Sequence, residues 1–338
     1  MIFLFNRDKK PPKSIILDLD VTDDQVHGNQ EGAFFNSYYK GVCYAPLYIF
    51  CGRHLLAAKL RSSNIDPASG ALEELQRVIG LIRQKWKTTH ITVRADSAYC
   101  REEILFFCEE QERVDYVIAM ATNSQLKLRA TVEIEKAQNN YELILEPVVK
   151  LMDNFFQKNE DLEEVRELVP DSIWYRSICY KTEKSWSRTR RVVTKISYGS
   201  EGVKIRHVVT SISASKISPS QLYTKKYCPR GEMENRLKEQ QLDLFADRTS
   251  SQTFESNQLR LWLSSIAYVL IQAFRQHCLN KTSLSKATVG TIRLNLLKLG
   301  ARITISIRRI VIAIASSCPI QDILAIVHSR IQALRDTS

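Results

Sequence analysis

The stretch S-I-I-L-D-L-D-V-T, residues 14–22, decides how this chain folds. Its first half is apolar, which is typical of a buried strand, and Asp18, Asp20 and Thr22 follow at alternate positions. Because side chains two residues apart in a strand point to the same side, these three polar groups share one face. The stretch therefore predicts a buried strand that carries acidic side chains toward its end.

A second acidic group follows another apolar run, I-T-V-R-A-D-S at residues 91–97. We expect a strand over 90–95 with Asp96 at its carboxyl end, and a helix over 99–112 capped by Ser97. The runs 42–50 and 54–60 predict two strands of a hairpin, 70–87 predicts a helix, and 114–119 predicts a further strand. The order β-β-β-α-β-α-β is that of a ribonuclease-H-like α/β fold, in which sites gather at the carboxyl ends of strands.

A third acid lies much later, in Y-C-P-R-G-E-M-E-N-R at residues 227–236. Arg230 and Glu234 are four residues apart and share a helix face, and Tyr227 comes one turn before Arg230. A tyrosine, an arginine and a carboxylate on one stripe can hold a phosphate and a metal together. Three separated acids, two after strands and one on a late helix, favour two-metal phosphodiester chemistry. Taken singly, each has a plainer interpretation as a cap, a loop residue or an ion pair.

Residues 124–222 interrupt this pattern. A helical first half is followed by strand-like runs at 173–180, 190–198 and 203–211, which predict an inserted, partly β-rich subdomain. Residues 181–206 hold eight basic and two acidic side chains, and we expect Trp186, Arg190 and Arg191 to face nucleic acid. Trp186 has two possible roles, stacking on an unpaired base or packing at the tip of the insertion.

The end of the chain is basic. We expect a helix over 252–279, a β-hairpin on either side of Gly300 and a short helix over 320–335. Residues 256–321 contain nine Lys or Arg and no Asp or Glu. These patterns predict four segments: a core over 1–123, the insertion over 124–222, the last core helices over 223–280 and a basic segment over 281–338.

Composition narrows the possible partners. The 338 residues carry a formal net charge of +11, which indicates a polyanion or an acidic surface as partner. No apolar run is long enough for a membrane span, and the apolar start at residues 1–5 is too short for a signal peptide. None of the eight cysteines has zinc-finger spacing, so we expect free thiols in a reducing compartment.

Together these motifs resemble the DDE transposases of bacterial insertion sequences, specifically the group-1 DDE domain. The resemblance rests on residues 17–32, 94–101 and 227–248 and continues through T-I-R-L-N-L-L-K-L-G-A-R. It implies catalytic, metal-binding acids at Asp20, Asp96 and Glu234, with Asp18 as the fallback for the first. Two Mg²⁺ or Mn²⁺ ions are the implied cofactors.

The resemblance also assigns phosphate-binding roles. Tyr227 and Arg230 match the tyrosine and arginine of the family's Y-R-E-K signature. The lysine of that signature falls at Gln241, and Lys238, one turn away on the same helix, is the candidate replacement. The implied reaction is hydrolytic cleavage at transposon ends followed by strand transfer into target DNA.

The resemblance also implies partners and a setting. These are double-stranded DNA from the transposon ends and the target, a homodimer in the DNA complex, no membrane and no small-molecule substrate. A cytoplasmic, nucleoid-associated protein is expected. Relatives carry a sizeable region before the first catalytic strand, which here starts within twenty residues of Met1, so we expect a truncated copy. Two alternatives stay open: a DNA-binding remnant or inhibitor without catalysis, and a ribonuclease-H-like nuclease that cuts without joining.

Overall fold

The structure, a computed structural model, describes residues 10–155 and 162–336. The chain divides into two units, each assembled from distant segments. We call Lys10–Asp20 with Asp66–Glu232 the sheet unit, and Val21–Ile65 with the described part of Met233–Ser338 the helical unit. The apolar start at 1–5 and part of the helical first half of the insertion, residues 156–161, lie outside the described residues.

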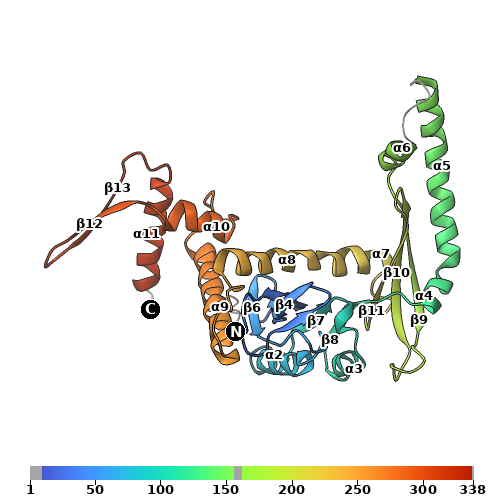
Figure 1. The fold of residues 1–338 in the computed structure, drawn as a ribbon, viewed down its shortest axis with the longest axis horizontal. Coiled ribbons are helices and arrows are strands. Elements are labelled where there is room, and N and C mark those ends of the chain that lie inside the picture. Colours follow the sequence, from blue (N-terminus) through green and yellow to red (C-terminus); the bar gives the residue numbers. More distant parts are fainter. Residues whose placement is uncertain (1–9, 156–161, 337–338) are drawn as a thin grey trace. The chain divides into compact units, whose positions relative to one another are not determined.

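The sheet unit is built on a mixed sheet with the strand order β1-β7-β8-β11-β10-β9 (Figure 1). Its strands are β1 (Ser14–Val21), β7 (His90–Ala95), β8 (Val114–Met120), β9 (Ser172–Tyr180), β10 (Arg190–Gly199) and β11 (Gly202–Thr210). Strands β1, β7 and β8 run parallel, and β11 joins β8 antiparallel. The insertion therefore extends the same sheet that carries the acidic motifs, through antiparallel β10 and β9.

Helices cover this sheet because their apolar positions recur at helical spacing. Helix α2 buries Leu75, Val78, Ile79 and Ile82, and α3 contacts both α2 and β8. Helix α5 lies along β9 and β10, as the long green helix of Figure 1 shows. The helices are α2 (Ala71–Lys85), η1 (Ser97–Tyr99), α3 (Glu102–Glu110), α4 (Ser124–Arg129), α5 (Thr131–Phe155), α6 (Leu162–Leu168), α7 (Pro219–Gln221), η2 (Leu222–Tyr227) and η3 (Cys228–Arg230).

The helical unit packs a helix pair against short strands. Tyr48 and Phe50 of β5, Met233 and Leu237 of α8, and Tyr268 of α9 belong to one buried apolar cluster. The elements are β2 (Asp24–Gln25), β3 (Phe34–Asn36), β4 (Gly41–Tyr44), β5 (Leu47–Cys51), β6 (His54–Lys59), α8 (Gly231–Lys238), η4 (Glu239–Asp243) and α9 (Phe254–His277). Strands β5 and β6 form an antiparallel hairpin, and α9 contacts β6.

The C-terminal part of the helical unit has a second small core, which includes Leu279, Ile292, Leu296 and Val327. The elements of this C-terminal part are α10 (Val289–Ile292), η5 (Arg293–Leu297), β12 (Ala301–Ile305), β13 (Ile310–Ile314) and α11 (Gln321–Asp336). Strands β12 and β13 pair antiparallel, and every residue of both is exposed. Among the described helices, none combines the length and apolar character that a membrane crossing requires.

Three local predictions were wrong. The expected strand over 42–50 is split, because Pro46 lacks the amide hydrogen that a continuous ladder needs. Ser97 does not cap α3; instead the Asp96 carboxylate accepts from the Ala98 amide and caps the short turn η1, and α3 begins at Glu102. The predicted hairpin around Gly300 is displaced, since residues 289–297 are helical and the strands meet at the turn over 306–309.

The displaced hairpin has a physical cause. The Thr288 side chain accepts from the Thr291 amide and caps α10. The Gly290 amide donates to Asp243 Oδ2 at 2.8 Å, so an acid lies at the N-terminus of the helix. Contacts with a residue 47 positions away cannot be read from local alternation.

Candidate active site in the sheet unit

Asp18, the first acid of the sequence motif, forms a buried ion pair with Arg94. Parallel β1 and β7 place Asp18 opposite Arg94. Both side chains are buried, and Arg94 donates from Nε and from Nη2, the latter at 2.8 Å, to the two Asp18 oxygens. A fork-to-fork pair of this kind satisfies both charges where water is excluded. Asp18 is therefore engaged in holding β1 to β7, and the fallback assignment loses its support.

Asp20 and Asp96 lie at the next level of the same two strands. Two residues beyond the Asp18–Arg94 pair, β1 carries Asp20 and the chain leaving β7 carries Asp96, both at the carboxyl end of these parallel strands. The Arg230 guanidinium stands between them: its Nη2 lies 2.8 Å from Asp20 Oδ2 and 3.9 Å from Asp96 Oδ2. Asp20 is 7% exposed, so this charge pairing occurs in a largely buried position.

Arg94 also fixes the segment that leads to Arg230. Its third nitrogen, Nη1, donates to the Lys226 carbonyl at 2.7 Å, at the end of the π-helix η2. The Tyr223 and Tyr227 rings of η2 lie 5.5 Å apart, and Tyr223 is buried in an apolar cluster with residues of β8 and β10. One buried arginine thus ties Asp18 to the turn from which Tyr227 and Arg230 project.

Tyr227 remains a hydrogen-bond donor in this environment. Burial raises the pKa of its phenol, the positive charge of Arg230 opposes that shift, and the negative charge of Asp96 reinforces it. A phenol with a raised pKa stays protonated near neutral pH and can donate to a phosphate oxygen.

Glu234 lies on α8, one helical turn after Arg230. Its neighbours Met233 and Leu237 are buried in the helical unit, which leaves Glu234 and Lys238 on exposed positions of the same helix. The structure thus brings together Asp20, Asp96 and Arg230 within the sheet unit. Glu234 belongs to the helical unit, and its approach to the two aspartates stays a prediction.

Gln241, at the position of the signature lysine, has a structural contact. Its Nε2 donates to the Asp23 carbonyl at 2.8 Å and to Thr22 Oγ1 at 3.2 Å. These bonds join η4 to the loop that follows β1. A side chain at position 241 therefore reaches the chain immediately after β1.

The family model described as transposase DDE domain, group 1, matches residues 2–336. The chain belongs to the transposase DDE domain group 1 family. No curated protein matches the chain. Among solved structures, a piggyBac transposase in a synaptic complex with hairpin DNA is similar, at 8% identity and a TM-score of 0.40. The match covers 78% of this chain and 47% of the piggyBac chain.

The family match confirms the predicted resemblance to the group-1 DDE domain, and the mixed sheet with its helices agrees with the predicted ribonuclease-H-like α/β fold. DDE domains use divalent metal ions, and the residues of this one fit such ions in their donor chemistry. Asp20 and Asp96 supply hard carboxylate oxygens, and both already face one positive charge, the Arg230 guanidinium. Within the described residues, no group of three His, Cys, Asp or Glu side chains is close enough to hold a metal.

The insertion residues expected to face DNA have structural contacts instead. Trp186 is 5% exposed; it packs edge-on against Tyr180, and the Arg190 guanidinium covers its ring. Trp186 is therefore packed in the structure, as the second of its two possible roles requires. Arg191 donates to Ser177 Oγ and to the carbonyls of Ile212 and Ile217.

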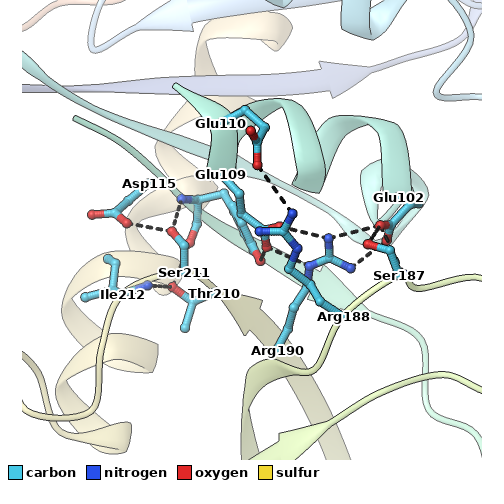
Figure 2. A network of polar contacts seen from close by, with 11 residues as sticks. Glu102, Glu109, Glu110, Asp115, Ser187, Arg188, Arg190, Thr210, Ser211 and Ile212 are labelled. Atoms are coloured by element: carbon cyan, nitrogen blue, oxygen red, sulfur yellow. Dashed lines mark hydrogen bonds and ion pairs between the residues drawn. The ribbon is translucent and has the colours of Figure 1, made fainter. Parts of the chain in front are cut away.

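Arg190 is held still more firmly, in the network of Figure 2. It is buried on β10 and pairs with Glu102 and Glu109 of α3, the latter at 2.7 Å from Nε. Glu109 also accepts from the Tyr116 hydroxyl at 2.7 Å. The DNA contacts expected of Trp186, Arg190 and Arg191 stay predictions, and they require these side chains to leave their present partners.

Sequence reasoning missed Arg94, the residue that organises the sheet side of the site. The available signal was a lone arginine inside the apolar run I-T-V-R-A. A charged side chain in a buried strand nearly always has a partner of opposite charge. The pairing of Asp18 with Arg94 depends on strand register, which one sequence does not specify.

Proposed function

We propose that this DDE domain cuts DNA at insertion-sequence ends and transfers the cut strand into target DNA, with Asp20, Asp96 and Glu234 holding two Mg²⁺ or Mn²⁺ ions. The observation that supports this most is the convergence of Asp20 and Asp96 on Arg230, one turn before Glu234. Two carboxylates that share a guanidinium form a site for positive charge at the carboxyl end of parallel strands. Bound divalent ions would supply an activated nucleophile and stabilise the leaving oxygen.

The chain's own residues then orient the phosphodiester. With the aspartates neutralised, the Arg230 fork becomes available to two phosphate oxygens, a geometry that lysine does not offer. The protonated Tyr227 phenol donates one further hydrogen bond. Lys238, exposed four residues after Glu234, adds a positive charge on the same helix face.

The partners follow from the same chemistry. We assign double-stranded DNA from the element's ends and from the target as substrate, supported by the net charge of +11. Two ends must be brought together before strand transfer, so the active complex contains two copies of the chain. The proposed location is the cytoplasm, associated with the nucleoid.

Metal-dependent cleavage and joining of a labelled duplex carrying the element's end tests this proposal. The wild-type chain is compared with Glu234→Gln, and Glu135→Gln is the matched control, because Glu135 is exposed on α5. We expect products that require Mg²⁺ or Mn²⁺, a loss of at least a thousandfold in rate in Glu234→Gln, and no change in Glu135→Gln.

The other outcomes separate the alternatives. Nicks without joined products would identify a ribonuclease-H-like nuclease. Salt-sensitive binding without any cleavage, equal in wild type and Glu234→Gln, would identify a DNA-binding remnant and overturn the proposed activity.

A further inference from the structure

One face of the inserted strands carries two positive charges directly opposite each other. In the antiparallel register, Lys195 of β10 pairs with Arg206 of β11, so the two side chains lie on the same face of the sheet. Tyr175 of β9 is the partner of Lys195 on its other side and belongs to the same face. Arg206 is exposed and Lys195 is half-buried. We call Lys195 and Arg206 the cationic pair.

No acid neutralises the cationic pair. Among the residues that the structure describes, no carboxylate lies within ion-pair distance of either side chain, although the neighbouring Lys204 pairs with Glu201 at 2.7 Å. Like charges that lie directly opposite each other in a sheet are destabilising. A pair of this kind at an accessible position indicates that an anionic ligand supplies the missing charge.

The two faces of the inserted strands are covered differently. On the far face, helix α5 lies along β9 and β10, and Ile196 is buried with Ala130 and Ala137. On the face of the cationic pair, η2 packs on the part of the strands that holds Val193 and Val208. The cationic pair comes two residues further along the same strands, where Arg206 is open to solvent.

The cationic pair adjoins a residue of the candidate active site. The Lys195 ammonium lies 5.8 Å from the centre of the Tyr223 ring, and the Tyr223 ring lies 5.5 Å from the ring of Tyr227. The Tyr175 ring is 5.8 Å from Tyr223 as well. All of these residues belong to the sheet unit, so the pair and Tyr227 are parts of one continuous surface region.

The chemistry of this region fits a phosphate backbone. Residues 202–231 contain six Lys or Arg and no Asp or Glu, so no acid of this segment repels an anion. Tyr223 is 2% exposed, and its ring is therefore not available to stack on a base. A surface that offers positive charge without a stacking ring suits the phosphates of a nucleic acid, which position the duplex.

We propose that the cationic pair binds phosphates of the DNA strand that Tyr227 and Arg230 hold. The inference rests on the proposed function and adds to it the surface through which the inserted strands contact DNA. It assigns this contact to the cationic pair instead of Arg190 and Arg191, whose guanidinium groups are bonded within the protein.

Binding to duplexes that carry a single neutral phosphate tests the proposal. Each duplex contains the element's end and one methylphosphonate on either side of the proposed cut, and mobility shifts are measured in EDTA so that cleavage plays no part. In the wild type, we expect the neutral group to weaken binding at the positions that the cationic pair contacts. Lys195→Gln/Arg206→Gln should bind the unmodified duplex about tenfold more weakly and should no longer respond to those methylphosphonates.

The matched control is Lys181→Gln/Lys184→Gln, which removes the same charge from exposed positions elsewhere in the insertion. It should keep the wild-type pattern of sensitive phosphates. Without DNA, we expect Lys195→Gln/Arg206→Gln to melt no lower than the wild type, because the two charges repel each other. If it does melt lower, Arg206→Gln alone, at the more exposed position, replaces it.

The remaining outcomes separate the pair from the proposed activity. A pattern of sensitive phosphates that is the same in the wild type and the folded variant would overturn the pair as a DNA contact, and so would an equal change in the control. Cleavage with an unchanged pattern would leave the proposed activity standing without the pair. A pattern that depends on the pair in a protein that does not cleave would leave the pair standing without that activity, and a wild type that binds none of the duplexes would overturn both.

Discussion

Asp18 and Asp20 lie two residues apart on one face of β1, and their surroundings give them different functions. Asp18 is paired with buried Arg94, whereas Asp20 faces Arg230 at the end of the strand. Asp18→Asn leaves the Arg94 charge buried without its partner, and we expect a loss of roughly 3–5 kcal/mol in the free energy of unfolding. Urea denaturation measures this loss.

We expect Asp20→Asn to affect catalysis more than stability. It removes an oxygen ligand from the proposed metal site, so we expect metal-dependent cleavage to vanish, while the free energy of unfolding falls less than in Asp18→Asn because the Asp20–Arg230 pair is more exposed than the Asp18–Arg94 pair. Measuring both quantities in both variants distinguishes the two roles. An Asp18→Asn protein of unchanged stability, or an Asp20→Asn protein with full activity, would contradict the assignment.

The sequence indicated several of the residues that meet in the candidate site. Spacing indicated Asp96 and Arg230 and left Asp18 and Asp20 as alternatives, and the family resemblance selected Asp20; the structure brings Asp20, Asp96 and Arg230 together. The sequence did not predict Arg94 or the bonds of Gln241 to the loop after β1. These contacts join residues 76 and 218 positions apart, and they depend on register and on packing.

Among the elements, strand β10 and helix α3 are joined by the Arg190 network of Figure 2. Its ion pairs hold the insertion to the core, and Arg190 and the Ser187 contacts lower the pKa of Glu102 to about 2, against an opposing effect of burial. A carboxylate whose folded pKa lies below its ordinary value stabilises the fold above that ordinary value. The contribution is then lost as the pH falls from about 4.5 toward 2.

We therefore expect the free energy of unfolding to fall steeply between pH 5 and pH 2.5, and Glu102→Gln to flatten this dependence. Urea titrations at a series of pH values measure it, with the exposed neighbour Glu103→Gln as the control. Equal pH slopes for wild type and Glu102→Gln would show that the network does not contribute in this range.

The bounds of helices and strands were predicted most accurately where the local sequence pattern is strongest. Strand β7 and helix α2 were predicted almost to the residue, because each has an uninterrupted period. The hairpin at β12 and β13 was displaced, since Thr288 and the distant Asp243 stabilise a helix over the residues before Gly300. Alternation of apolar residues could not reveal that competition.

At the level of the whole molecule, the positive charge is unevenly distributed. Residues 256–321 hold nine Lys or Arg and no acid, and the exposed turn between β12 and β13 presents Arg308 and Arg309. Each phosphate contact releases counterions, so binding to duplex DNA should weaken linearly in log affinity against log salt. The slope is expected to be about −0.9 for each phosphate neutralised.

Arg308→Gln/Arg309→Gln should make this slope shallower by about 1.8 if both side chains contact phosphates. Fluorescence anisotropy with a labelled duplex at a series of salt concentrations measures it. Lys85→Gln/Lys87→Gln removes the same charge from exposed positions at the end of α2 and is the matched control. If the two variants lower affinity equally and leave equal slopes, net charge alone governs binding. A change in the hairpin variant alone would instead identify β12 and β13 as a part of the chain that contacts DNA.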